Sequence, residues 1–164
     1  MTESPFRLVR QATLEALYEF ETSEHDPEAS YERRLRDLAA EAGAEIGDGP
    51  RGFGKGMLRG ILRLQPEIDR HIQEAATQYP IDTLAIVDRN ILRLAIWELL
   101  TDNSAPVAAV VNEAVELAHR YGGESSPGFV NGVLRTVSQR IHAAKTALHE
   151  TPQEAATQPK SSPQ

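Results

Sequence analysis

The sequence contains no cysteine among its 164 residues. This absence excludes a disulfide framework and any metal site built from thiolates. The five histidines offer no substitute, because no two of them lie three or four residues apart, the spacing that places two side chains on one helix face. We therefore expect neither a metal nor another cofactor.

Long apolar runs and excess positive charge are also lacking. No stretch approaches the roughly 20 apolar residues that cross a bilayer, and the start, MTESPFRLVRQ, lacks the charged-then-apolar pattern of a signal peptide. We expect a soluble, cytoplasmic protein. Lysine and arginine number 17 against 24 acidic residues, for a net charge of −7. Such a balance argues against a general phosphate binder, so nucleic-acid contacts would have to come from a local basic patch.

Alternation with period two, the mark of a half-buried strand, is absent as well. Apolar residues recur instead with helical spacing, which predicts an all-α fold. The glycine-rich stretch 43–56 is predicted to be a loop, and the Pro-, Gln- and Ser-rich segment 149–164 a disordered tail. We predict helices over 5–22, 27–43, 53–78, 88–100 and 107–121, and a last helix from about 126.

One stretch, GPRGFGK at 49–55, fits the phosphate-loop pattern G-x-x-x-x-G-K. The pattern requires a serine or threonine next, to hold Mg²⁺, and here Gly56 follows. It also requires a preceding strand, whereas the segment before it is helical. We therefore expect no nucleotide hydrolysis and no catalytic residues, and interpret the stretch as a flexible loop that enters a helix.

Four basic residues recur every four positions from this stretch onward and form a stripe on one helix face. A stripe of this kind is either a solvated surface or a contact to a nucleic-acid backbone. Its members are Arg51, Lys55, Arg59 and Arg63.

An Asn-Gly pair, Asn131-Gly132, stands in PGFVNGVLRTV at 127–137. Asn-Gly usually signals a hairpin, but the residues after it keep a helical period. We place the pair in the first turns of the last helix. Glycine costs about 1 kcal/mol there relative to alanine, so we expect Gly132 to lie at a close helix crossing. Phe129 is predicted to be either a core anchor or a ligand contact.

Three blocks together resemble the NusB family of bacterial transcription antitermination factors. They are RQATLEALYEFE at 10–21, VDRNILRLAIWELL at 87–100 and VVNEAVELAHRYGGESSPGFVNGVL at 110–134. The resemblance covers roughly 6–141. It implies two packed helical bundles, about 1–79 and 80–148. It also implies a non-catalytic protein that binds boxA RNA of ribosomal RNA transcripts together with NusE, a protein of the small ribosomal subunit, within the RNA polymerase antitermination complex.

The resemblance also assigns site residues. For RNA it implies Arg7 and Arg10 as phosphate contacts and Phe129 as a stacking platform, and the N-terminus of the last helix at Ser126 as a source of free backbone N–H groups. Lys55 of the basic stripe is a further candidate for the RNA. For NusE it implies Tyr18 and Asp88, where family members carry an aromatic residue and an acid.

The sequence departs from the family pattern in its charges. Family members usually begin with several consecutive arginines, and the turn before Phe-Val-Asn-Gly usually carries Asp and Lys, where this chain has Ser125 and Gly128. Fewer phosphate contacts weaken RNA affinity and its dependence on salt. The alternative is therefore a self-associating or protein-binding NusB-like module, possible as a homodimer, with weak or no RNA binding. The same fold also forms the RNA-binding N-terminal part of an RNA cytosine methyltransferase family. This interpretation would apply only if the sequence were a fragment, because it has no room for the catalytic domain.

Overall fold

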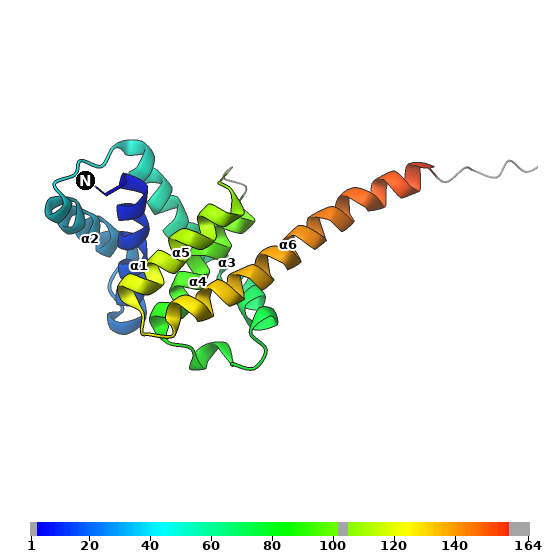
Figure 1. Ribbon diagram of the computed structural model, residues 1–164. Helices are drawn as coiled ribbons and strands as arrows, with labels where there is room; N and C mark the ends of the chain where they lie inside the picture. Colours follow the sequence, from blue (N-terminus) through cyan, green and yellow to red (C-terminus); the bar gives the residue numbers. More distant parts are fainter. Residues whose placement is uncertain (1–2, 102–104, 158–164) are drawn as a thin grey trace, which may run out of the picture.

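The computed structural model describes residues 3–101 and 105–157, with side chains up to residue 148. Every regular element in these ranges is a helix, so the predicted all-α class is confirmed (Figure 1). The elements are α1 (Pro5–Ser23), α2 (Pro27–Ala42), α3 (Asp48–Ala75), the 3-10 turn η1 (Ile81–Thr83), α4 (Ile86–Leu100), α5 (Val107–Tyr121) and α6 (Ser126–Thr157).

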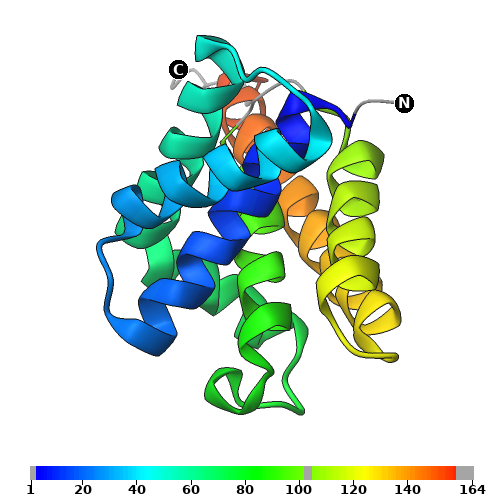
Figure 2. The same cartoon turned by 90° about the vertical axis from the view of Figure 1, so that its left-hand side faces the viewer.

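Helix α1 is the central element. It packs on α2, α3 and α4, while α4, α5 and α6 pack on one another. Figure 2 shows α1 in the middle of the view, crossed by α2, with α3 to its left and α5 to its right. The buried side chains of all six helices form one continuous apolar cluster. The division into bundles at about residues 79 and 80 stays a prediction.

A buried arginine ties the first helices to the later ones. Arg93 of α4 is only 5% exposed, and it donates to both carboxylate oxygens of Asp69 in α3 at 2.8 and 2.9 Å. It also donates to Glu21 of α1 at 2.6 Å and to Asn90 at 3.0 Å. Arg89 bonds the second oxygen of Glu21 at 2.6 Å. Burial opposes the charge of Arg93, but its acidic partners outweigh burial and raise its pKa.

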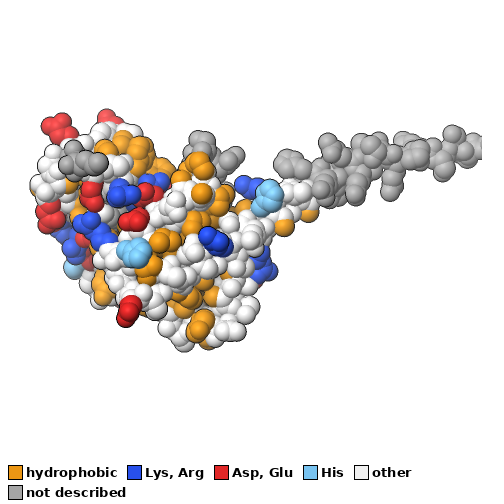
Figure 3. Space-filling view, in the orientation of Figure 1, with side chains coloured by type: hydrophobic (Ala, Val, Ile, Leu, Met, Phe, Trp, Pro, Cys, Tyr) orange, Lys and Arg blue, Asp and Glu red, His pale blue; other side chains and the backbone are white. Residues whose placement is uncertain are grey.

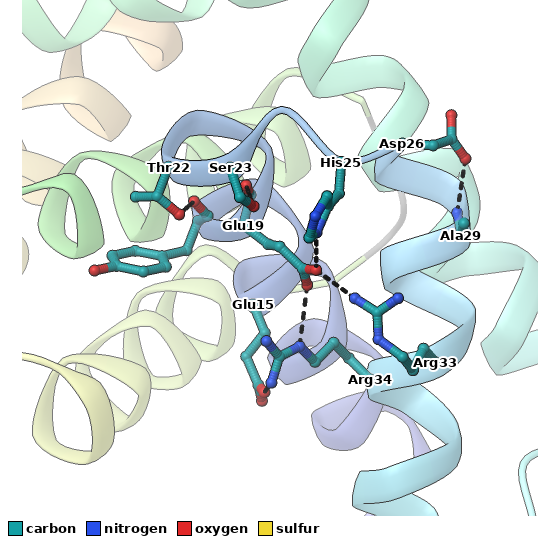
Figure 4. Close-up of polar contacts among 10 residues, drawn as sticks. Glu15, Glu19, Thr22, Ser23, His25, Asp26, Ala29, Arg33 and Arg34 are labelled. Carbon is teal, nitrogen blue, oxygen red and sulfur yellow. Dashed lines mark hydrogen bonds and ion pairs between the residues drawn. The ribbon is translucent and has the colours of Figure 1, made fainter.

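A second network fixes the turn from α1 to α2 (Figure 4). The buried carboxylate of Glu19 lies 2.7 Å from Nδ1 of His25 and 3.2 Å from Nε of Arg34, and it also pairs with Arg33. The bond from His25 contributes most, and with the arginines it outweighs burial and lowers the pKa of Glu19 to about 2. Asp26 then caps α2 by accepting from the backbone N–H of Ala29 at 2.9 Å.

Helix α3 begins earlier than the sequence predicts. The segment 49–55, expected to be a flexible loop, forms its first turns, so the loop prediction is wrong there. Asp48 complements the positive helix terminus and Pro50 suits the first turn. Because this segment is helical, it does not form the loop that the phosphate-loop pattern requires.

Close packing explains why glycines are tolerated in this helix. A Cβ on Gly54 would lie 2.9 Å from the Cβ of Val9 in α1 and would also collide with the ring of Tyr31 in α2. The carbonyl of Gly54 accepts from the hydroxyl of Thr13 at 3.3 Å, which marks the same crossing. On the other side of α3, a Cβ on Gly60 would collide with the indole of Trp97. Tertiary contact therefore outweighs the low helix propensity of glycine.

Gly132 is not such a crossing, so that prediction is wrong. No described atom lies within 4 Å of the position that its Cβ would take, and the residue is exposed. Val130, Val133 and Leu134 turn inward from α6, which leaves Gly132 on the outer face. Gly56, the expected loop-edge glycine, faces open space in the same way.

Two other local predictions change in detail. Ser4 is the N-cap of α1, next to the predicted start of this helix at residue 5, and its side chain makes no capping hydrogen bond. Helix α6 leaves the body of the molecule as a long rod and continues to Thr157, beyond residue 148 (Figure 1). The rest of the predicted tail, 158–164, lies outside the described residues.

The contact at Gly54 predicts an asymmetric response to added methyl groups. Gly54→Ala should lower the free energy of unfolding by about 1–3 kcal/mol because it overpacks the crossing. Gly132→Ala should raise it by up to about 1 kcal/mol through helix propensity alone. Urea unfolding of both variants checks this. Equal stabilities would contradict the close contact.

Glu19 predicts a defined pH dependence. A carboxyl whose pKa falls from 4.5 to about 2 on folding stabilises the fold above pH 4.5, and this contribution is lost as the pH falls toward 2. Glu19→Gln should therefore lower stability at pH 7, and the difference from the wild type should shrink between pH 4.5 and 2. Urea titrations at pH 7, 4.5 and 3 measure it. Glu41→Gln, on the exposed surface of α2, is the control that should change little.

Candidate RNA-binding and partner-binding surfaces

Arg10, implied as a phosphate contact, is held inside the fold. Its guanidinium makes two hydrogen bonds to the carboxylate of Glu98 in α4, at 2.9 and 2.7 Å, and lies 5.3 Å from the ring centre of Phe53. The Arg10 side chain is 14% exposed and that of Glu98 2%. Burial opposes the charge of Arg10, but Glu98 outweighs burial and raises its pKa. The geometry makes Arg10 a link between α1 and α4.

Arg7 is more accessible, although it also has an acidic partner. It donates to both oxygens of Glu113 in α5, at 3.2 and 2.9 Å, and its side chain is 39% exposed. The hydrogen bond from Arg7 to Glu113 is the main cause of the raised pKa of Arg7. A half-exposed pair of this kind contributes little to stability, so Arg7 can exchange Glu113 for a phosphate at low cost.

The basic stripe of α3 pairs with acids of α2. Arg51 and Lys55 bond the same carboxylate, Glu32, at 2.9 and 3.0 Å, and Arg59 pairs with Glu28. Figure 3 shows basic and acidic side chains intermixed over the α1 and α2 end of the molecule, while hydrophobic side chains spread over the face formed by α5 and α6. Lys55 therefore belongs to a surface on which basic residues of α3 pair with acidic residues of α2.

The start of α6 carries an aromatic pair. The ring of Phe129 meets that of Tyr79 edge to face, with centroids 6.0 Å apart. Phe129 is half-buried against the core, whereas Tyr79 is 53% exposed. Both line a cavity of about 340 Å³ together with Gly128, Gly132 and the end of α3. Phe129 therefore both packs against the core and forms part of the cavity wall.

Ser126 lies apart from this cavity. It is 4% exposed, and its hydroxyl oxygen accepts from the backbone N–H of Gly123 at 3.0 Å. Its side chain therefore fixes the turn between α5 and α6. The backbone N–H of Phe129 is also used, because it donates to the carbonyl of Ser125 at 3.1 Å.

The two residues implied for NusE are connected by one cavity, which Tyr18 lines together with the residue that precedes Asp88. Tyr18 is 44% exposed and lines a cavity of about 310 Å³ with Leu14 and Val87, the residue before Asp88. One carboxylate oxygen of Asp88 is covered and has no hydrogen-bond partner in the described part of the chain. The floor of the cavity is fixed by Tyr121, which donates to Glu15 at 2.8 Å. Burial, ahead of this bond, raises the pKa of Tyr121.

Sequence reasoning missed Tyr79 and the acidic partners Glu98 and Glu113. Tyr79 lies in the short segment between α3 and η1, where no local sequence pattern marks it as a ligand-binding residue. The two acids lie 88 and 106 residues from the arginines that they bind, so no local pattern reports them.

No cluster of three or more potential ligating side chains that could hold a metal ion occurs among the described residues. Within the same ranges, no helix is long and apolar enough to cross a bilayer.

Comparison with known proteins agrees with the fold and with the sequence blocks. The chain matches the NusB family over residues 7–139. The transcription antitermination protein NusB of Chloroflexus aggregans is 40% identical over 146 residues, which cover 87% of this chain and 92% of that protein. The chain belongs to the NusB family.

Solved structures show the same likeness. The structure of T. maritima NusB has a TM-score of 0.69 at 31% identity, covering 85% of this chain and 93% of that one. A chain from a crystal structure of the antitermination factors NusB and NusE in complex with dsRNA has a TM-score of 0.66 at 26% identity, covering 82% of this chain and 96% of that one.

The different surroundings of the two arginines predict different effects on stability. Arg10→Ala should cost several kcal/mol because it breaks a buried, bidentate pair. Arg7→Ala should cost less than about 1 kcal/mol, as half-exposed pairs do. Thermal unfolding of the two variants at the same salt concentration compares them directly. A milder effect at Arg10 than at Arg7 would show that Arg10 is not a structural link.

Proposed function

We propose that this chain is a transcription antitermination factor that binds boxA RNA together with NusE and supports transcription of ribosomal RNA. Family membership and the likeness to a chain from a structure of NusB and NusE in complex with dsRNA support this function. The protein acts by binding, without catalysis, in the cytoplasm, and it joins the RNA polymerase antitermination complex through these contacts.

The aromatic cavity at the start of α6 carries the RNA part of the proposal. Single-stranded RNA is bound largely by stacking its bases on aromatic side chains. Tyr79 is exposed and its ring lies edge to face with that of Phe129. The cavity that both rings line can therefore receive one base, which would stack on an aromatic ring. Stacking does not require net positive charge, which suits a chain with a net charge of −7.

Phosphate contacts are few in this proposal. Arg7 is the phosphate-binding arginine of α1, since Arg10 is committed to Glu98. The loss of family arginines therefore shifts affinity from phosphate contacts toward base stacking, and the salt dependence of binding should be shallow.

The NusE part rests on the Tyr18 cavity. An exposed tyrosine beside an apolar cavity is a common anchor in protein interfaces. Asp88 directly follows Val87 of this cavity and contributes an acidic side chain beside it in the chain. This surface uses no residue of the aromatic cavity, so the two partners do not compete for the same side chains.

Two substitutions should separate RNA binding from partner binding. Tyr79→Ala and Phe129→Leu should each weaken single-stranded boxA RNA by about 1–3 kcal/mol, roughly 5- to 150-fold, and leave the salt slope unchanged because no phosphate contact is lost. Tyr18→Ala should weaken NusE binding and leave RNA binding alone unchanged. Fluorescence anisotropy with labelled RNA, with and without NusE, measures both.

The controls follow from burial. Tyr79 is exposed, so its removal should leave the melting temperature unchanged, while Phe129→Leu conserves apolar volume at the half-buried position. Wild-type affinity in two well-folded variants would refute the aromatic site. A wild-type chain that sediments as a dimer and binds no boxA RNA would favour the self-associating module instead.

A further inference from the structure

Gln11 of α1 carries a buried amide that the fold does not use. It is 1% exposed, and its carbonyl oxygen is covered without a hydrogen-bond partner in the part of the chain that the structure describes. The residue lines a cavity of about 230 Å³ between α1 and α5. The other lining residues are Glu3, Arg7, Glu113, Glu116, Leu117, His119 and Arg120.

Packing gives no reason for an amide at this position. A buried polar group without a partner lowers the stability of a fold, whereas an apolar side chain of similar length avoids that loss. The neighbouring buried positions Leu8, Ala12 and Leu14 are apolar. An unused amide that lines a cavity therefore points to a ligand that supplies the missing hydrogen bonds.

The ion pairs at the rim of this cavity can separate, and their arginines can then stack on a planar ligand. It is formed by two ion pairs, Arg7 with Glu113 and Arg120 with Glu3 at 3.2 Å. Their side chains are between 27% and 48% exposed, and ion pairs this accessible hold little free energy. Once released, the flat guanidinium of either arginine can lie against a planar ring.

The size and the charge of the cavity limit the kinds of ligand that it can hold. A volume of about 230 Å³ is smaller than the roughly 300–1,000 Å³ of pockets for drug-sized molecules, so it suits a single ring system. Glu3, Glu113 and Glu116 disfavour the entry of a phosphate. A base can enter such a cavity while its phosphate stays outside, near Arg7.

The amide decides which base fits. A glutamine side chain offers one donor and one acceptor side by side, and it pairs in this way with N6–H and N7 of adenine. We propose that the cavity between α1 and α5 takes one adenine of a single-stranded RNA and that Gln11 is the residue that reads it. This inference rests on the proposed function in RNA binding and adds a base-specific contact to the non-specific stacking at Tyr79 and Phe129.

The test is a base scan combined with a substitution. Each adenine of a single-stranded boxA RNA is replaced in turn by purine riboside, which lacks the N6 amino group, and affinities are measured by fluorescence anisotropy. In the wild type, one position should lose about 5- to 100-fold in affinity. In Gln11→Met, binding of the unmodified RNA should fall by a similar factor, and the loss at that position should disappear. Gln139→Met, on the exposed face of α6, is the matched control that should reproduce the wild-type scan.

The melting temperature shows whether Gln11 recognises a base or serves the fold. Gln11→Met should melt at or above the wild-type temperature, because it removes an unpartnered amide. A lower melting temperature with an unchanged scan would show that the amide serves the fold, and would overturn the inference. So would a loss of NusE binding with an unchanged scan, which would assign the cavity to a protein. RNA binding that depends on Phe129 but shows no position coupled to Gln11 overturns this inference alone, whereas a wild-type protein that binds no RNA overturns the proposed function as well.

Discussion

A central helix that carries charges must find a partner for each charge that it buries. Helix α1 packs on α2, α3 and α4, and it carries Arg10 and Glu19 inside these contacts and Glu21 at its exposed C-terminal end. An unpaired buried charge would cost more than most single contacts contribute. Two neighbours supply the partners. Helix α4 provides Glu98 for Arg10 and both Arg89 and Arg93 for Glu21, while the α1–α2 turn and α2 provide His25 and Arg33 for Glu19.

These pairs determine which residues are left for ligands. Arg10 lies on the same helix as Arg7, only three positions later, but the two face different surroundings. The inner one holds α4 in place and the outer one stays at a rim where its acid can be exchanged. In the proposed RNA binding, burial therefore decides which arginines of α1 are available as much as their number does. A count of cations in the sequence overstates the phosphate contacts that this surface can make.

The sequence was sufficient for the helical class, for most helix positions and for the family, because periodicity and the Phe-Val-Asn-Gly block are local signals. It failed where tertiary contact overrides local preference. Gly54 falls within the predicted loop although it packs against Val9, and Gly132 is predicted to lie at a helix crossing although its Cβ position faces open space.

The site was less predictable than the fold for the same reason. Phe129 could be chosen from the sequence, but its partner Tyr79 lies across a gap of 50 residues that only folding closes. Gln11 gives no signal at all in RQATLEAL, since a polar residue on a helix is usually exposed. Its burial depends on α5, which packs on α4 and α6 and is linked to α1 by the bonds from Arg7 to Glu113 and from Tyr121 to Glu15.

The same bonds connect the surfaces to one another. Glu15 and Tyr121 close the floor of the Tyr18 cavity, while Arg7 and Glu113 form the rim of the Gln11 cavity, and both pairs join α1 to α5. Under the proposed function, a phosphate that draws Arg7 away from Glu113 removes one of these two links and leaves the other, which is made by the half-buried Tyr121 with its raised pKa. We therefore expect RNA to open the rim without releasing α5 from α1, so that the surface proposed for the protein partner keeps its shape.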